Sequence, residues 1–317
     1  MQESTENQRV GPLPHAHCPL GRTGALLPAL GLGCVTFGRE LGEDESFRIL
    51  DHALEQGLSL FDTAESYGTS EEIIGRWLAS RDFPKEVTIC TKVSFDNSPE
   101  HIACAVRGSI ERLGIAEIDL YLLHVWDERV PIGETMSALK EQIDAGNVKA
   151  LGGSNFTAEQ LLAANEAGAK LGVRLEAVQN IYNLAKASEQ DAVFDLCRNE
   201  DISFIAFSPL GAGFLTGKYT ASRDDLPADS RFAVKPAHCD IYFSERNFQV
   251  VERLREKAEK TGETMTHLAS AWVTSSPDVA CTLVGARTTE HIDNAMRAYK
   301  EGLSASQREE MLAWGTH

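Results

Sequence analysis

Four side chains capable of acid–base chemistry stand at the ends of three short apolar runs. Asp62 and Tyr67 follow LSLF in the segment DTAESYG, Lys92 ends VTICTK, and His124 ends DLYLLH. An ammonium beside a phenol stabilises the phenolate and lowers the pKa of the phenol, and a carboxylate beside the ammonium keeps it charged. An imidazole can orient a carbonyl oxygen or relay a proton. Together these groups can protonate an oxygen as negative charge develops on it, as carbonyl reduction requires.

Eight short runs of strand-forming residues can position these side chains. They alternate with amphipathic segments of helix length, without a linker or a change of composition between them. The runs cover residues 30–33, 58–61, 87–91, 118–123, 150–154, 175–179, 204–207 and 280–284. This alternation predicts an α/β fold with one (β/α)8 TIM barrel, rather than a Rossmann domain followed by a second domain. Barrel enzymes carry their chemistry at the carboxyl ends of the strands, an end that we call the mouth.

Several segments outside the strands also carry signals. We expect a polar tail at residues 1–17 and a single barrel domain at residues 18–317. Residues 19–28 contain the turn sequence GRTG, which predicts an N-terminal β-hairpin. Ser98-Pro99 predicts a helix start, and Gly146 and Gly172 predict helix ends. Residues 220–242, after the seventh strand, show no periodicity, and a loop of this length predicts a functional lid.

Composition excludes several classes of protein. The net charge of −17, without clustered cations, argues against a nucleic-acid binder. Apolar runs stay well short of the ~20 residues that cross a bilayer, so we expect no membrane partner. The seven cysteines are scattered and lack a Cys-x-x-Cys pair, which predicts reduced thiols in a cytoplasmic protein and no metal site.

The four acid–base residues and their surrounding motifs resemble the catalytic tetrad of the aldo-keto reductases. Further motifs of that family occur in order along nearly the whole chain: LGRTG, LGLG with a following FG (30–38), GGSNF (152–156), QNIYNL (179–184), SPLGAGFLTGKY (208–219) and VGAR (284–287). Val125-Trp126-Asp127 and the loop after strand seven are closer to the longer-chain branch that is aryl-alcohol-dehydrogenase-like and potassium-channel-β-like. By this resemblance Tyr67 is the general acid, Lys92 lowers its pKa, Asp62 pairs with Lys92, and His124 positions the substrate.

The resemblance also implies an NADP(H) molecule bound across the mouth, with no metal. Its nicotinamide would contact Ser154, Asn155, Gln179 and Phe207, with Gly33 and Cys34 nearby. Its pyrophosphate would contact Ser208, Pro209, Leu210, Gly211, Ala212 and Lys218, and Arg231 would close over it. Its 2′-phosphate and adenine would contact Gly285, Arg287, His291 and Asn294. The family commonly has Gln or Arg where this chain has His291, and an acidic-Asn pair where it has Asn294-Ala295. Arg287 still supplies a cation for the 2′-phosphate, so NADP(H) is preferred and NAD(H) stays an alternative.

Two classes of function follow from the sequence. One is an oxidoreductase that interconverts an aldehyde or ketone, such as a sugar or an aromatic carbonyl, with its alcohol by hydride transfer. The other is an NADP(H)-binding redox sensor or regulatory subunit with little turnover. Phe37 and Trp126 either line the substrate pocket or pack the mouth. The expected partner is a small carbonyl or alcohol substrate.

Overall fold

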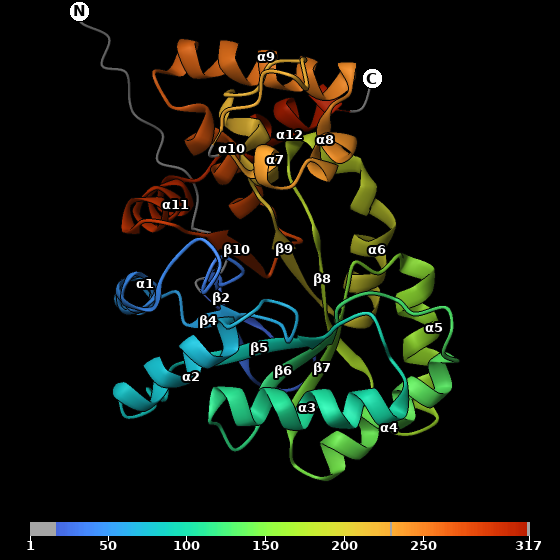
Figure 1. Cartoon of the computed structure of the whole chain (residues 1–317). Helices are drawn as coiled ribbons and strands as arrows, with labels where there is room; N and C mark the ends of the chain where they lie inside the picture. The colour runs from blue at the N-terminus through green and yellow to red at the C-terminus, as the bar shows by residue number, and fades with distance from the viewer. Residues whose placement is uncertain (1–16, 229, 316–317) are drawn as a thin grey trace, which may run out of the picture.

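Eight parallel strands form a closed barrel. The computed structural model of the protein describes residues 17–228 and 230–315, so the predicted polar tail lies outside the described residues except for His17. The strands close in the order β10-β3-β4-β5-β6-β7-β8-β9 (Figure 1). Their bounds are β3 Leu30–Gly33, β4 Leu60–Asp62, β5 Thr88–Val93, β6 Ile118–Leu123, β7 Val148–Ser154, β8 Leu175–Ile181, β9 Ser203–Phe207 and β10 Cys281–Gly285. The predicted TIM barrel is confirmed, and each predicted strand overlaps one barrel strand.

Amphipathic helices cover the outside of the barrel. They are α1 Glu43–Glu55, α2 Ser70–Ser80, α3 Pro99–Leu113, α4 Ile132–Asp144, α5 Ala158–Ala169, α6 Asp191–Glu200, α9 Glu245–Thr261, α10 Met265–Thr274, α11 Thr289–Glu301 and α12 Ala305–Leu312. The predicted start of α3 is confirmed, because the Ser98 side chain accepts a hydrogen bond from the His101 N–H and Pro99 occupies the first turn. Gly146 and Gly172 follow α4 and α5 with φ values of 72° and 75°, where a glycine ends a helix without strain. No helix among the described residues is long and apolar enough to cross a membrane.

An N-terminal hairpin packs against the barrel interior. Strands β1, His17–Pro19, and β2, Leu26–Pro28, pair antiparallel as predicted. Leu27 of β2 and Leu20, which follows β1, belong to the same buried cluster as the interior side chains of the barrel strands. The hairpin is also tied to the first residue of β9, since Ser203 Oγ donates to the Pro19 carbonyl and accepts from the Gly21 N–H. The end of the barrel opposite the mouth is therefore filled by apolar side chains.

The segment after β9 is more ordered than its sequence predicts. Instead of a structureless loop at residues 220–242, it contains two short helices, α7 Arg231–Val234 and α8 Ala237–Tyr242. They follow the 3-10 segment η2, Gly211–Thr216, and Figure 1 shows them in the same part of the molecule as α9 and α12. Phe232 of α7 is fully buried and stacks on Tyr219 with ring centroids 4.2 Å apart. Aromatic packing, which has no sequence period, orders this segment.

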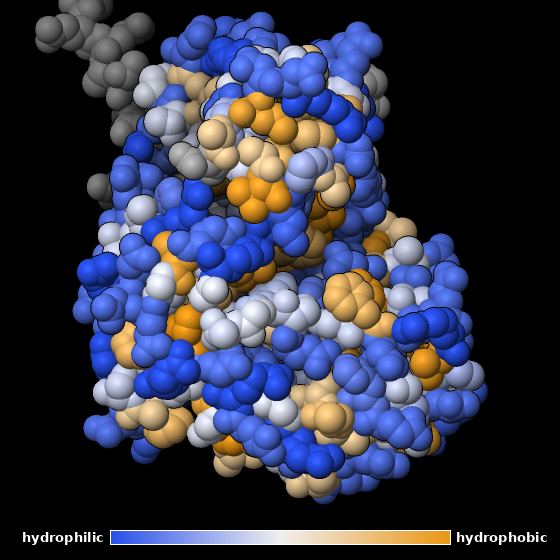
Figure 2. All heavy atoms as spheres, in the orientation of Figure 1, coloured by the Kyte–Doolittle hydropathy of each residue, from blue (hydrophilic) through white to orange (hydrophobic). Residues whose placement is uncertain are grey.

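The remaining elements are two further 3-10 segments: η1, Leu184–Gln190, which follows β8, and η3, Ala313–Gly315, which follows α12. In the orientation of Figure 1, the surface is hollowed between the α7–α8 part of the molecule and its lower half (Figure 2). Hydrophobic residues lie along part of this hollow, between otherwise hydrophilic surfaces.

Candidate active site

A buried ion pair connects the ends of β4 and β5. Asp62 is the last residue of β4, and Lys92 of β5 is fully buried. Lys92 Nζ donates to Asp62 Oδ1 at 2.7 Å and to the Thr63 carbonyl at 2.6 Å, and the same Asp62 oxygen accepts from Gln179 Nε2 at 2.7 Å. The carboxylate of Asp62 raises the pKa of Lys92 above its ordinary value in spite of the burial. The lysine is therefore held as a fixed positive charge.

Tyr67 faces this charge from the loop after β4. Lys92 Nζ lies 5.2 Å from the centroid of the Tyr67 ring. Burial nevertheless raises the pKa of Tyr67, outweighing the lowering by Lys92, and Asp62 adds to the rise. The prediction that Lys92 lowers the pKa of Tyr67 is right for the effect of Lys92 itself. It is wrong for the sum of all effects, which raises the pKa. The Tyr67 hydroxyl is protonated at neutral pH and available as a proton donor.

His124 stands next to Tyr67 at the end of β6. The two rings form an edge-to-face contact with centroids 5.6 Å apart. Burial and the charge of Lys92 lower the pKa of His124 to about 4, so its imidazole is neutral at pH 7. Nδ1 lies 3.1 Å from Ser94 Oγ, which also donates to Ser66 Oγ. Because Nδ1 is engaged in this way, Nε2 is the nitrogen left to contact a substrate.

The ends of β7 and β8 add amide groups beside the tetrad. Asn155 follows β7 in the left-handed region, with φ of 60°, and its Nδ2 donates to the His124 carbonyl and to Ser154 Oγ. Its N–H donates to the Gln179 carbonyl. Ser154 and Gln179 are both buried. The amide nitrogen of Gln179, a residue expected to contact a nicotinamide, donates to Asp62.

The chain after β9 turns back on itself through left-handed residues. Ser208, Gly211, Ala212 and Gly213 have φ values of 58°, 58°, 55° and 91°. The Ala212 N–H donates to Ser208 Oγ, which fixes the turn. The Gly211 and Gly213 N–H groups donate to the Ser208 and Leu210 carbonyls, so the turn is closed by its own hydrogen bonds. Phe207 precedes the turn, and Pro209 and Leu210 lie within it. All three are partly exposed.

Cations converge on the same side of the barrel despite the acidic composition. Partial burial and Arg287 lower the pKa of Lys218, while burial and Arg39 lower the pKa of Arg231. Among the described residues, no acidic side chain lies within ion-pair distance of Lys218 or Arg287. Arg231 of α7 reaches across to the loop after β3, where its Nη1 lies 3.4 Å from Glu40 Oε1. The structure thus brings most of the predicted phosphate-binding cations close enough to perturb one another.

The predicted adenine-side residues lie around the start of α11. Burial and Arg287 lower the pKa of His291, and its Nδ1 accepts a hydrogen bond from the Arg287 N–H at 3.2 Å. Gly285 ends β10, and Asn294 lies within α11; both are exposed. These residues form an exposed continuation of the cationic region.

Three predicted residues near β3 are less accessible than expected. Cys34 and Phe37 have no exposed surface, and Gly33 pairs with Asp62 in the barrel register. Phe37 packs in the cluster between β3, β4 and helices α1 and α2, so the structure gives it a packing role and not a place in the pocket wall. Trp126 is partly buried and packs edge-to-face on Phe156 with centroids 5.4 Å apart. Its exposed part leaves it as a candidate pocket residue.

Two residues of the site were missed from the sequence. Ser94, the partner of His124, is two residues after Lys92, so the alternation along a strand already places it on the same side. Phe95 stacks over the His124 ring with centroids 6.3 Å apart and is 65% exposed. No sequence signal distinguishes Phe95, because its exposure depends on the conformation of the loop.

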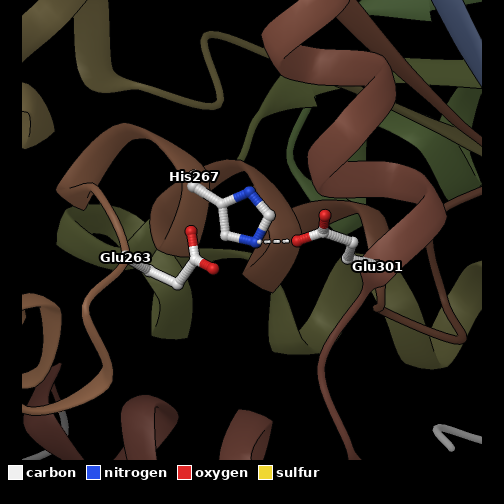
Figure 3. Close-up of side chains that lie close together, drawn as sticks. All are labelled: Glu263, His267 and Glu301. Carbon is white, nitrogen blue, oxygen red and sulfur yellow. Dashed lines mark ion pairs between the residues drawn. The ribbon is translucent and has the colours of Figure 1, made fainter.

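A second group of possible ligands lies between α10 and α11. Glu263, His267 and Glu301 point toward one another, and His267 Nε2 lies 3.3 Å from Glu301 Oε2 (Figure 3). Arg297 donates to both oxygens of Glu263 and to Glu301, each at 2.9 Å. Arg297 already pairs with both carboxylates, so this cluster is explained as an ion-pair network.

Comparison with known proteins agrees with this geometry. A sequence model described as "Aldo/keto reductase family" matches residues 29–313. The "Uncharacterized oxidoreductase YrpG" of Bacillus subtilis is 31% identical, over 90% of this chain and 91% of its own length. The "Aldo-keto reductase yakc [NADP(+)]" of Schizosaccharomyces pombe is 29% identical, over 88% and 85%. The "Probable voltage-gated potassium channel subunit beta" of Arabidopsis thaliana is 31% identical, over 88% and 89%.

Proposed function

This chain belongs to the aldo/keto reductase family, whose members act on carbonyl compounds, and we propose that it interconverts an aldehyde or ketone with its alcohol, with NADP(H) as the preferred cofactor. The observation that carries the proposal is the convergence of Tyr67, His124 and the buried Lys92–Asp62 pair at the mouth. The Schizosaccharomyces pombe relative carries NADP(+) in its name, which supports the choice of cofactor.

In the reductive direction Tyr67 gives its proton to the carbonyl oxygen. Its raised pKa keeps the proton in place until negative charge develops on that oxygen. As the phenolate forms, the ammonium of Lys92 stabilises it, because the two groups are close and Lys92 is fully buried. Asp62 keeps the lysine charged and in place through the 2.7 Å hydrogen bond. In the oxidative direction the same groups act in reverse, and Tyr67 accepts the proton of the alcohol.

His124 orients the substrate oxygen. A neutral imidazole carries one N–H, and when Ser94 donates to Nδ1 that proton is on Nε2, where it can donate to a carbonyl oxygen. In the structure the single hydroxyl proton of Ser94 goes to Ser66 Oγ, so Ser94 must turn its hydroxyl toward Nδ1 for that tautomer to form. Donation by His124 to a carbonyl oxygen therefore requires the Ser94 hydroxyl to move from Ser66 to Nδ1.

The residues around the mouth fit a dinucleotide that carries phosphate groups. The cations Lys218, Arg231 and Arg287 would hold its phosphates, beside the turn at Ser208–Gly213 that the family resemblance assigns to the pyrophosphate. Lys218 and Arg287 have no acidic partner within ion-pair distance among the described residues, so their charge is free for an anion. A bound nicotinamide cofactor supplies the hydride of the reaction.

The proposal has a direct test in two matched Tyr→Phe variants. Tyr67→Phe removes the proposed acid, whereas Tyr121→Phe removes a buried hydroxyl of β6 that has no hydrogen-bond partner. We expect Tyr67→Phe to lower turnover of carbonyl substrates by a factor on the order of 10²–10⁴ and to leave NADPH binding, measured by tryptophan fluorescence, nearly unchanged. Tyr121→Phe should retain both the turnover of carbonyl substrates and the binding of NADPH. Full turnover in Tyr67→Phe would overturn the role of Tyr67.

The regulatory alternative predicts a different outcome for the unchanged protein. A sensor or regulatory subunit would bind NADPH without measurable reduction of any aldehyde or ketone in a broad panel. All seven cysteines are unpaired, which supports a reducing compartment such as the cytoplasm for either role.

A further inference from the structure

Phe95 has an unusual conformation for an aromatic residue. It is the most exposed large hydrophobic side chain among the described residues, at 65%, and its φ of 68° lies in the left-handed region. A bulky side chain is strained there, because its Cβ approaches the backbone. Of the seven non-glycine residues described with positive φ, four follow barrel strands at the mouth: Phe95, Asn155, Ser208 and Ala212. Strain of this kind persists where the surrounding structure imposes it, and it gathers at functional sites.

The loop that carries Phe95 is held from both sides. On one side, Glu65 of the loop after β4 accepts the Ser94 N–H at 2.6 Å. On the other side, Arg129 of the loop after β6 donates to the Phe95 carbonyl, and Asp127 accepts the Asn97 N–H. These contacts fix the backbone immediately before, at and after Phe95. The backbone that presents the phenyl ring to solvent is thereby held in place.

That position is next to the proposed reaction centre. The Phe95 ring is nearly parallel to the His124 ring, with an interplanar angle of 22° and centroids 6.3 Å apart. A substrate oxygen at His124 Nε2 and Tyr67 would leave the remainder of the substrate beside this ring. A flat apolar group of the substrate that covers this exposed ring would be bound favourably, because apolar surface is removed from water and the two flat groups stack.

We infer that Phe95 is a specificity-determining residue of this enzyme and that it selects carbonyl compounds with an aromatic or flat apolar group over small polyhydroxy aldehydes. The inference rests on the proposed function, which it deepens by naming the substrate class. It assigns a role to the strain. The loop holds the backbone of Phe95 in place before the substrate binds, which lowers the cost of ordering this loop on binding.

The test uses two phenylalanines that share the same backbone conformation. Phe83 also has a positive φ, of 51°, and is 45% exposed, but it lies in the turn before β5, at the end of the barrel away from the mouth. Phe95→Gly and Phe83→Gly both relieve the left-handed strain, so both variants should keep or raise the melting temperature. Only Phe95→Gly should change selectivity. The readouts are kcat/KM for benzaldehyde and for glyceraldehyde with NADPH, and equilibrium binding of benzaldehyde to the protein saturated with NADP⁺.

We expect Phe95→Gly to lower kcat/KM for benzaldehyde about tenfold and to weaken its binding by a similar factor, as for the loss of one aromatic contact. Its kcat/KM for glyceraldehyde should stay within about twofold, and Phe83→Gly should match the unchanged protein on both substrates. An unchanged ratio of the two kcat/KM values in Phe95→Gly, or an equal loss on both substrates, would overturn the inference while leaving the proposed function intact. Binding of benzaldehyde that depends on Phe95, without reduction of any carbonyl by the unchanged protein, would support recognition of the aromatic group by Phe95 and overturn the proposed function.

Discussion

His124 should make the stability of this protein depend on pH in a predictable way. Burial and the charge of Lys92 lower its pKa in the folded protein from 6.5 to about 4. Between these values the unfolded chain binds a proton at this histidine and the folded protein does not, so lowering the pH favours unfolding. The contribution of neutral His124 is therefore fully present above about pH 6.5 and is lost as the pH falls toward 4.

The size of this effect follows from the two pKa values. The complete shift corresponds to about 3 kcal/mol at about 1.36 kcal/mol per pKa unit, of which about 2.5 kcal/mol is lost by pH 4.5. His124→Gln removes the titrating group and keeps a side chain that can donate and accept hydrogen bonds. Urea unfolding followed by circular dichroism, between pH 7 and pH 4.5, gives the free energy of unfolding of both proteins.

We expect the unchanged protein to lose about 2 to 2.5 kcal/mol more stability than His124→Gln over this range. Burial also lowers the pKa values of His238 and His291, but these residues are common to both proteins and their effects cancel in the difference. Parallel pH dependence of the two proteins would refute the reasoning, because it would mean that the imidazole of His124 is solvated well enough to titrate normally.

Three further predictions concern the ion pair, the barrel packing and the cofactor. Lys92→Met leaves the buried carboxylate of Asp62 without its counter-charge and should lower the free energy of unfolding by about 3–5 kcal/mol, while Lys92→Met combined with Asp62→Leu should recover part of the loss in the same urea assay. A Cβ at Gly152 would lie 2.7 Å from a backbone oxygen of β8, so Gly152→Ala should lower the free energy of unfolding by about 1–3 kcal/mol. Gly133 of α4 has open space around it, so Gly133→Ala should not lower the melting temperature. Arg287→Ala should weaken NADPH binding about tenfold or more and leave NADH binding within about twofold in fluorescence titrations; equal weakening of both would contradict a 2′-phosphate role.

The sequence alone predicted the barrel and the gathering of the tetrad. Strand-forming runs are local features, and Asp62, Lys92 and His124 are next to such runs in the chain. Since the carboxyl ends of parallel strands meet at one end of a barrel, the topology was enough to bring the three together. The same logic extends to Ser94, whose two-residue spacing from Lys92 was a usable signal.

The sequence did not predict the order in the segment after β9. Its stacking of Phe232 on Tyr219 joins residues that are separated by an irregular stretch, and such packing leaves no period of 2 or 3.6 residues in the chain. Phe37 shows the same limit in the opposite sense: a residue next to a strand end can face the mouth or the helices, and the structure places it among α1 and α2.

The electrostatics of the site were decided by the tertiary structure. Residue types indicated that Lys92 lowers the pKa of Tyr67, and it does so, but the net pKa is raised because burial is the larger effect. Burial depends on all the elements packed around a group, so no spacing within the chain encodes it. The same holds for the conformation of Phe95, which is imposed by Glu65 and Arg129 from neighbouring loops. The sequence thus determined which groups meet at the mouth, and only packing between distant segments decided their protonation, their partners and the surface that they offer to a substrate.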